Sequence, residues 1–240
     1  MSALSANLQA VRERIARACE SVGRCATDVA LLAVSKTFPA ESVRDAHAAG
    51  QRAFGENYVQ EGCEKVSALA DLGLEWHFIG PLQSNKTRLL AQHFAWVHSI
   101  ERIKIAERLS EQRPPEHAAL QVCIQVNVSG EASKSGVAVE EVEALALAVA
   151  KLPRLRLRGL MAIPEPTQDH AKLAARFRLL RELRDGLNLR HGLQLDTLSM
   201  GMSDDLEIAI EEGATIVRVG TAIFGARTKA QPPGPAPLHQ

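Results

Sequence analysis

The 240-residue sequence has few aromatic residues, no excess of either charge and no long apolar segment. Aromatic side chains make up only 4% of the chain, so the core must come mainly from Ala, Leu, Val and Ile. Lys plus Arg and Asp plus Glu number 28 each, which leaves no extended basic surface for nucleic acid or an anionic membrane. No apolar run approaches the roughly 18 residues of a membrane-spanning helix. Neither nucleic acid nor a membrane is an expected partner.

Cysteine is also sparse, and its positions suit neither a metal site nor a disulfide framework. Cys19, Cys25, Cys63 and Cys123 form no C-x₂-C pair and fall in different expected elements. The first twenty residues have the pattern of an amphipathic helix and not that of a signal sequence. These features predict a reduced, cytoplasmic protein that binds no metal.

The sequence does contain short apolar runs that alternate with helical patterns. The expected strands are 29–34, 52–54, 75–79, 95–99, 120–128, 156–163, 195–200 and 215–220. Strands that alternate with helices predict parallel βαβ units, and eight units favour a closed α/β barrel, the (β/α)₈ or TIM barrel of about 250 residues. We expect one domain over residues 1–229 and a disordered Pro-rich tail at 230–240.

An extra amphipathic helix precedes the first expected strand. Its apolar face comprises Leu4, Leu8, Val11, Ile15, Ala18 and Val22. Gly23 provides a C-cap, so the helix should end there and pack outside the barrel.

The first candidate for chemistry is Lys36, at the end of the first expected strand. Functional groups of this fold lie at the C-terminal ends of the strands, and phosphate usually binds after strands 7 and 8. Lys36 shares the alternation of Leu32 and Val34, so it points into the barrel mouth if those two face the interior. The alternative is a lysine that extends to solvent.

The segment after the seventh strand has features of a phosphate site. Gly201 allows close backbone approach, and a helix expected to begin near Ser203 would offer free N–H groups. Asp204, Asp205 and Glu207 suit the first turn of that helix, but they would repel an anion if they turned inward. The alternative is an ordinary capped helix.

The eighth strand adds a buried charge and a second turn. Arg218 shares the alternation of Ile216, which places its guanidinium inside the barrel, where a charge is costly without a partner. A buried carboxylate partner is the alternative explanation. Gly220 and Thr221 begin a turn opposite Ser203. One amine, two phosphate turns and a buried arginine together fit a phosphorylated aldehyde cofactor.

Several motifs, taken together, resemble the pyridoxal phosphate homeostasis protein family, which is related to the N-terminal barrel of alanine racemase. The motifs, spread from about Leu31 to Arg227, are AVSKTFP, FGENYVQE, WHFIGPLQSNK, SKSG, GLMAIP, LSMGMSDDLEIAIEEGAT and VRVGTAIFGAR. The resemblance implies that Lys36 carries pyridoxal 5′-phosphate as an internal aldimine and that Arg218 faces the pyridine nitrogen. The other implied cofactor-binding residues are Ser203, Gly220 and Thr221 at the phosphate, Asn57 and Met161 beside the ring, and Ser199.

The chain departs from the family pattern at one position. Many relatives carry a second lysine two positions after the Schiff-base lysine, where this chain has Phe38, so a role for such a lysine is in doubt here. Lys134, in the SKSG motif, is a possible accessory amine, although a solvated loop lysine explains it equally well.

Two arguments favour a carrier over an enzyme. Arg218 can only donate to the pyridine nitrogen and leaves it neutral, so the ring withdraws electrons weakly. Racemisation needs a second acid, which alanine racemase takes from the tyrosine of an additional β domain; we expect no such domain here, and expect Tyr58 to be structural. We therefore expect a monomer that holds the cofactor and delivers it to apo-enzymes, with no catalytic residue.

Two alternatives remain open. One is a pyridoxal-phosphate-dependent racemase or related enzyme, which the fold and Lys36 would allow. The other is a cofactor-free phosphosugar isomerase, which would need Glu56 or His77 as its base. For His77, a hydrogen-bonded position in the core is the commoner case.

Overall fold

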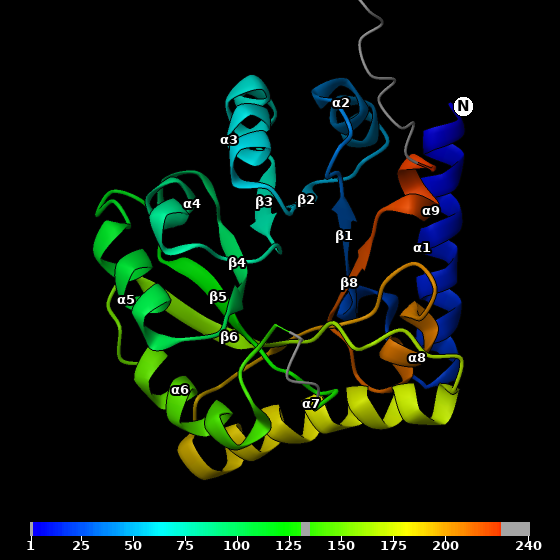
Figure 1. Ribbon diagram of the computed structural model, residues 1–240. Helices are drawn as coiled ribbons and strands as arrows, with labels where there is room; N and C mark the ends of the chain where they lie inside the picture. Colours follow the sequence, from blue (N-terminus) through cyan, green and yellow to red (C-terminus); the bar gives the residue numbers. More distant parts are fainter. Residues whose placement is uncertain (1, 131–134, 227–240) are drawn as a thin grey trace, which may run out of the picture.

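The computed structural model describes residues 2–130 and 135–226, and its strands close into one barrel. Neighbouring strands pair in parallel and in chain order, with β1 hydrogen-bonded to both β2 and β8 (Figure 1). The strands are β1 (Ala30–Val34), β2 (Ala53–Glu56), β3 (Glu75–Phe78), β4 (Trp96–Ile100), β5 (Leu120–Gln125), β6 (Leu155–Met161), β7 (Thr197–Ser199) and β8 (Ile216–Val219). The expected (β/α)₈ barrel is confirmed. The expected tail at 230–240 lies outside the described residues.

Helices form the outer layer of the barrel (Figure 1). They are α1 (Ala3–Ser21), α2 (Ala40–Ala48), α3 (Val59–Ala68), α4 (Thr87–His93), α5 (Ile103–Gln112), α6 (Val142–Val149), α7 (His170–His191), α8 (Leu206–Glu211) and α9 (Thr221–Phe224). Short 3₁₀ turns lie at Ala26–Asp28, Ala70–Leu72, Ser84–Lys86 and Val139–Glu141.

The strand alternation divides the buried side chains into two layers. Ala33 of β1 belongs to the large core between strands and helices, whereas Leu32 and Val34 belong to a small cluster with Ile79 and Ile216 inside the barrel. Among the few aromatic residues, four phenylalanines are fully buried in the outer core: Phe54, Phe78, Phe94 and Phe177. Each such side chain contributes about 1.5–3 kcal/mol when it leaves water. The apolar clusters inside the barrel are smaller than the outer core, and part of the interior is polar.

Helix α1 packs outside the barrel against α8 and α9, as expected (Figure 1). The expected apolar face is buried at Leu8, Val11, Ile15 and Ala18. The helix ends at Ser21 and Gly23 adopts φ 68°, which a glycine accommodates without strain. The C-cap residue of the helix, Val22, lies at the surface. The helix is therefore placed beside the two elements that follow β7 and β8.

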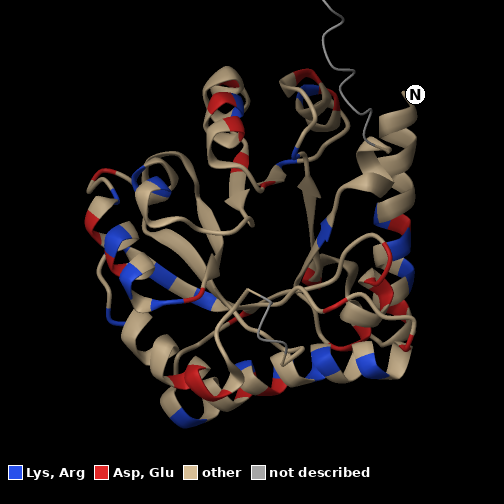
Figure 2. Cartoon of the chain, viewed as in Figure 1, with Lys and Arg blue, Asp and Glu red and all other residues tan. Residues whose placement is uncertain are grey.

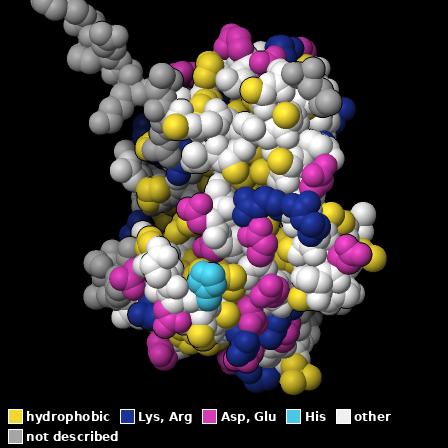
Figure 3. Space-filling model, turned by 90° about the vertical axis from the view of Figure 1, so that its right-hand side faces the viewer, with side chains coloured by type: hydrophobic (Ala, Val, Ile, Leu, Met, Phe, Trp, Pro, Cys, Tyr) yellow, Lys and Arg dark blue, Asp and Glu magenta, His cyan; other side chains and the backbone are white. Residues whose placement is uncertain are grey.

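Basic and acidic residues are interspersed along the outer helices (Figure 2). On the side of the molecule that carries α1, acidic and basic groups lie next to each other among scattered apolar side chains (Figure 3). No helix in the described part of the chain is long and apolar enough to cross a membrane.

Candidate functional site

A cavity of about 340 Å³ opens at the C-terminal ends of the strands. Its walls bring together six residues predicted from the sequence: Lys36, Asn57, Ser203, Arg218, Gly220 and Thr221. These residues follow β1, β2 and β7, or belong to β8 and the turn after it. Its size lies within the range of small-molecule sites. The amine, the buried guanidinium and both turns therefore face one space.

Lys36 lies just beyond β1, half-buried, on the same wall as Val34. Both neighbours of the lysine are tied to other elements: the Ser35 hydroxyl donates to Oε1 of Glu56 (2.7 Å), and the Thr37 N–H donates to Oε1 of Glu61 (2.5 Å). Thr37 adopts φ 68°, a conformation that is rare outside glycine and needs such support. The lysine is therefore positioned by the backbone on both sides.

A buried ion pair lies behind this turn. Nζ of Lys65 contacts Oε1 of Glu56 and the carbonyl of Ser35, both at 2.7 Å, and Oε1 of Glu61 at 2.6 Å. The Glu56 side chain is fully buried and that of Lys65 is 7% exposed. Burial raises the pKa of Glu56, and the charge of Lys65 opposes that shift. Glu56 is therefore engaged in holding β1, β2 and α3 together.

The expected start of the helix after β7 is wrong. Helix α8 begins at Leu206, not near Ser203, because the Asp205 side chain accepts the Met202 N–H and holds 203–205 as a turn. Gly201 has φ 90°, and a Cβ there would lie 2.6 Å from the Cβ of Ala209, so only glycine fits. Ser203 is thereby left facing the cavity instead of capping a helix.

The three acidic residues near this turn have different surroundings. Glu207 is paired with Arg14 of α1 at 2.8 Å, and Asp205 accepts the backbone N–H of Met202. Asp204 alone lines the cavity, in an exposed position at its edge. Two of the three carboxylates therefore already have an ion-pair or hydrogen-bond partner.

Helix α1 fixes both turns of the predicted phosphate site. Nη2 of Arg14 donates to the carbonyl of Ser203 (2.9 Å), and Nδ2 of Asn7 donates to the carbonyl of Ile223 in α9 (3.1 Å). In the second turn, a Cβ on Gly220 would lie 3.1 Å from the carbonyl oxygen of Val34, so β8 closely approaches β1 there. Thr221 is exposed at the first position of α9, where N–H groups have no partner within a helix.

Arg218 is 3% exposed and its guanidinium is held by neutral groups. Nη1 donates to the carbonyl of Ser199 and to its hydroxyl (2.8 Å), and Nη2 donates to the carbonyl of Ala162 (2.8 Å). Within the described ranges no carboxylate forms an ion pair with it, so the alternative of a buried acidic partner is not supported. Burial lowers the pKa of Arg218 to about 10.

Asn57 provides a polar atom without a partner in the cavity wall. Its Oδ1 is buried and accepts no hydrogen bond from any residue that the structure describes. Its backbone packs closely against Gly80, where an added Cβ would lie 2.1 Å from the Asn57 carbonyl oxygen. A buried acceptor without a donor is costly in a protein alone. It therefore indicates that a ligand donor or water completes the site.

Two residues predicted at the cofactor do not line this cavity. Met161 is fully buried inside the barrel with Trp96 and Cys123. Ser199 is also fully buried and contacts Arg218 and His98. A direct contact of either with a cofactor stays a prediction.

Three further residues considered from the sequence are Phe38, Tyr58 and Lys134. Phe38 lines the cavity and stacks on Phe224 of α9, with ring centroids 5.1 Å apart. Tyr58 directly precedes α3 at an exposed position, and its structural role stays a prediction. Lys134 lies outside the described residues.

Sequence reasoning missed His98 of β4, which is fully buried inside the barrel. It hydrogen-bonds with His77, whose buried, hydrogen-bonded position in the core is confirmed. The alternation of the 95–99 strand could have revealed it, because His98 has the same parity as Trp96.

Comparison with known proteins identifies the family of the chain. The family described as "Alanine racemase, N-terminal domain" matches residues 3–228. The pyridoxal phosphate homeostasis protein of Pseudomonas aeruginosa is 63% identical over 232 residues, which cover 97% of this chain and 99% of that protein. The Escherichia coli protein of the same name is 54% identical over 230 residues, with 95% and 98% covered.

The chain belongs to the pyridoxal phosphate homeostasis protein family. Among solved structures, PipY of Synechococcus elongatus with pyridoxal phosphate bound superposes with a TM-score of 0.78 at 39% identity. That match covers 88% of this chain and 100% of PipY. A protein that shares this fold and 39% of its sequence thus has pyridoxal phosphate bound.

Proposed function

We propose that this protein binds pyridoxal 5′-phosphate covalently on Lys36, holds it in reserve and releases it to apo-enzymes. The observation that carries the proposal is the convergence of Lys36, Arg218 and the Ser203 and Thr221 turns on one cavity. The protein of the same family with pyridoxal phosphate bound supports the choice of cofactor. Two relatives are named pyridoxal phosphate homeostasis proteins, and a role in homeostasis supports the proposed buffering and delivery.

The residues present fit this cofactor group by group. The ε-amine of Lys36 would condense with the aldehyde: the nitrogen gives up two hydrogens, the carbonyl carbon gives up its oxygen, and water leaves. Ser203 and Thr221, after β7 and β8, would hold the phosphate where this fold usually binds one. Arg218 would donate to the pyridine nitrogen, and Oδ1 of Asn57 would accept a hydrogen bond from the ligand or a bound water.

The same residues favour holding the cofactor over using it to catalyse a reaction. When bound, the cofactor supplies an electron sink, and an arginine at its pyridine nitrogen keeps that nitrogen neutral and the sink weak. Within the described residues, the cavity walls contain Lys36 and Asp204 as the only ionisable groups besides Arg218. Asp204 lies at the exposed edge. The site thus offers a second proton-transfer group only at its rim.

The geometry gives little support to a cofactor-free isomerase. Glu56 is bound to Lys65 and Ser35, and His77 is bound to Glu75 and His98. Neither side chain lines the cavity. We also propose that the protein acts as a monomer in the cytoplasm, which sedimentation and fractionation would test.

A spectroscopic titration tests covalent binding. Wild-type protein and a Lys104→Ala control, changed at an exposed lysine of α5, should develop the visible band of an imine on addition of pyridoxal phosphate. Lys36→Ala should show only the spectrum of free aldehyde. A band of equal strength in Lys36→Ala would contradict the proposal.

A second measurement separates the carrier from a racemase. The holoprotein is incubated in deuterium oxide with a panel of amino acids, and incorporation at Cα is followed by mass spectrometry. A carrier should show exchange no faster than free pyridoxal phosphate. Exchange at the rate of an enzyme would establish the racemase-type alternative instead.

A further inference from the structure

A line of polar side chains crosses the barrel interior from one mouth to the other. At the N-terminal end of the strands, Oε1 of Glu75 lies 2.8 Å from Nε2 of His77, and Nδ1 of His77 lies 2.9 Å from Nε2 of His98. Nδ1 of His98 then lies 2.8 Å from Oγ of Ser199, which also accepts from Nη1 of Arg218 at 2.8 Å. The line ends at the predicted cofactor cavity.

The two ends of this line are in different environments. Glu75 is 52% exposed and lines a second cavity, of about 440 Å³, at the N-terminal mouth of the barrel. His77, His98, Ser199 and Arg218 are all buried, with 2% of His77 and none of His98 exposed. A carboxylate in contact with water is thus linked through three buried groups to the arginine of the cofactor cavity.

An ionised Glu75 and two neutral histidines would fix the direction of every hydrogen bond in this line. Arg218 can only donate, and an ionised Glu75 can only accept. With both histidines neutral, His77 must donate from Nε2 to Glu75 and accept at Nδ1, so His98 donates from Nε2 and accepts at Nδ1. The Ser199 hydroxyl therefore donates to His98, and its lone pairs face Arg218.

With Glu75 ionised, the opposite direction requires a buried cation. If His98 donated from Nδ1 to Ser199, His77 would have to donate from Nδ1 as well, and it could contact Glu75 favourably only as an imidazolium. Burial lowers the pKa of His77 against the effect of Glu75, and burial lowers the pKa of His98 well below its usual value. The hydrogen bond from His77 lowers the pKa of Glu75. Neutral histidines beside an ionised Glu75 are therefore the favoured state.

The direction decides whether Ser199 accepts a hydrogen bond from Arg218 alone or from Arg218 and His98 together. Arg218 has five N–H donors. Three of them are taken by the Ser199 carbonyl, the Ser199 hydroxyl and the Ala162 carbonyl. The other two N–H groups have no hydrogen-bond partner within residues 2–130 and 135–226 and could serve a ligand. In the reversed chain, Ser199 would have to receive hydrogen bonds from Arg218 and His98 together and direct its own proton elsewhere.

We propose that Glu75, His77, His98 and Ser199 form a hydrogen-bonded chain that positions Arg218 toward the cofactor, with Glu75 setting its direction from the opposite mouth of the barrel. The inference rests on the proposed binding of pyridoxal phosphate. The four residues are positioning residues, since they act through Arg218.

The first test needs no cofactor. Long-range ¹H–¹⁵N correlation spectra of the apoprotein near neutral pH report which ring nitrogen of each histidine carries the proton. His77 and His98 should both be protonated at Nε2 alone. A His98 protonated at Nδ1, or a cationic His77, would overturn the proposal even if pyridoxal phosphate binds.

The second test measures the effect on binding from a distance. Glu75→Gln replaces the obligate acceptor with an amide that can donate or accept, so His98 should populate both tautomers. The dissociation constant for pyridoxal phosphate should rise about three- to tenfold, the equivalent of about one net hydrogen bond. Ser199→Ala, which removes an acceptor of Arg218, should weaken binding by a similar factor.

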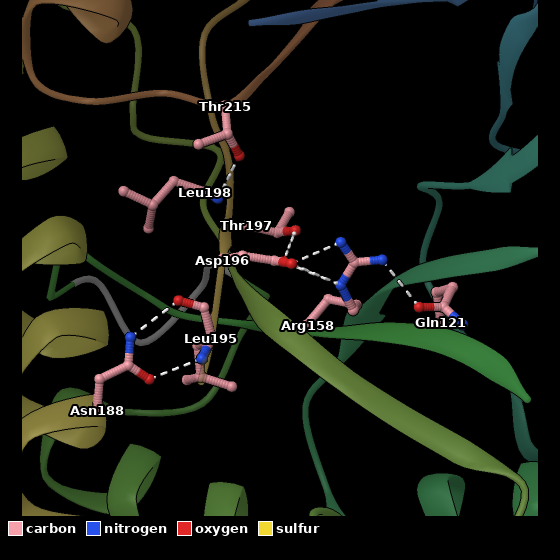
Figure 4. A network of polar contacts seen from close by, with 8 residues as sticks. All are labelled: Gln121, Arg158, Asn188, Leu195, Asp196, Thr197, Leu198 and Thr215. Carbon is pink, nitrogen blue, oxygen red and sulfur yellow. Dashed lines mark hydrogen bonds and ion pairs between the residues drawn. The ribbon is translucent and has the colours of Figure 1, made fainter. Parts of the chain in front are cut away.

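Asp196 provides a matched control at the same mouth. It lines the same cavity as Glu75, but its carboxylate is paired with Arg158 (2.7 Å; Figure 4) and, among the described residues, has no hydrogen bond to Glu75, His77, His98 or Ser199. Asp196→Asn should change the dissociation constant less than Glu75→Gln does, because the partners of its carboxylate, Arg158 and Thr197, are not members of the hydrogen-bonded chain. Equal effects of Glu75→Gln and Asp196→Asn would overturn the proposal. A wild-type protein that bound no pyridoxal phosphate would remove the proposed function instead, while the apoprotein spectra would still test the chain.

Discussion

At the scale of residues, the position of Lys36 depends on a buried ion pair that does not line its cavity. Lys65 contacts Glu56, Glu61 and the Ser35 carbonyl, and so holds the turn that carries Lys36. Glu56 is fully buried, with its Oε2 unpartnered among the described residues, so loss of Lys65 would leave an uncompensated carboxylate.

Lys65→Met should therefore lower the free energy of unfolding by about 3–5 kcal/mol, as measured by urea denaturation. The double variant Lys65→Met with Glu56→Met should recover much of this loss, because it removes the unpaired charge as well. Lys104→Met, on the exposed face of α5, serves as the control and should change stability little. A single variant as stable as this control would show that the buried pair contributes nothing.

The buried histidines make the stability depend on pH. His77 faces Glu75 and His98, and His98 faces His77 and Arg218; burial lowers the pKa of both rings. In the unfolded chain histidine titrates near 6.5, so below that pH the unfolded state binds protons that the folded state does not. The free energy of unfolding should fall as pH drops from about 6.5, with a smaller slope in His98→Gln. Equal slopes in the two proteins would contradict this account.

For single residues, the sequence predicted which way a side chain faces but not which groups it contacts. Alternation along the strands correctly placed Arg218 inside the barrel and Lys36 at its mouth, because a period of two assigns each side chain a face. It could not give the partners of Arg218, which are carbonyls and a hydroxyl from β6 and β7. Those contacts depend on how the barrel closes.

At the scale of elements, α1 supports the predicted phosphate site. The sequence placed this helix outside the barrel from its apolar face, and the structure shows why its polar side matters. Arg14 is bonded to the Ser203 carbonyl and to Glu207, and Asn7 is bonded to Ile223. One helix thus holds the two turns that follow β7 and β8.

Arg14→Met keeps the aliphatic stem but removes the hydrogen bonds of the guanidinium to Ser203 and Glu207. The Ser203 turn should become less well fixed, and the dissociation constant for pyridoxal phosphate should rise about three- to tenfold, measured by titration of the visible band. Arg17→Met is the control on the same helix, since the side chain of Arg17 is 68% exposed and contacts only Glu13 at 4.0 Å among its described ion-pair partners. Equal affinities for the two variants would rule out support from α1.

The helix after β7 shows where prediction of elements failed. Ser203 followed by acids has the pattern of a helix start, yet α8 begins at Leu206. The side chain of Asp205 bonds back to the Met202 N–H and stabilises a turn in competition with the helix. Local sequence preference alone could not decide between these two uses of the same residue.

At the scale of the whole molecule, the barrel brings together residues from its first strand and its last. The closing pair of β1 and β8 places Lys36 beside Arg218 and Thr221, although more than 180 positions separate them in the chain. A cofactor bound there would contact both ends of the fold. It should therefore stabilise the closed barrel as a unit.

Binding should raise the free energy of unfolding by about 2.7 kcal/mol when pyridoxal phosphate is present at 100 times its dissociation constant. Urea denaturation with and without the cofactor measures this difference. Lys36→Ala should show a much smaller gain at the same cofactor concentration, whereas Lys104→Ala should match the wild type. An equal gain in Lys36→Ala would place the cofactor elsewhere.

Peptide mapping of the reduced holoprotein is the most direct test of the central claim. Borohydride converts the imine formed by pyridoxal phosphate into a stable amine, and mass spectrometry of a digest then locates the modified lysine. We predict the adduct at Lys36, between Ser35 and Thr37, at a stoichiometry near one. Modification spread over exposed lysines, with Lys36 unmodified, would contradict the account.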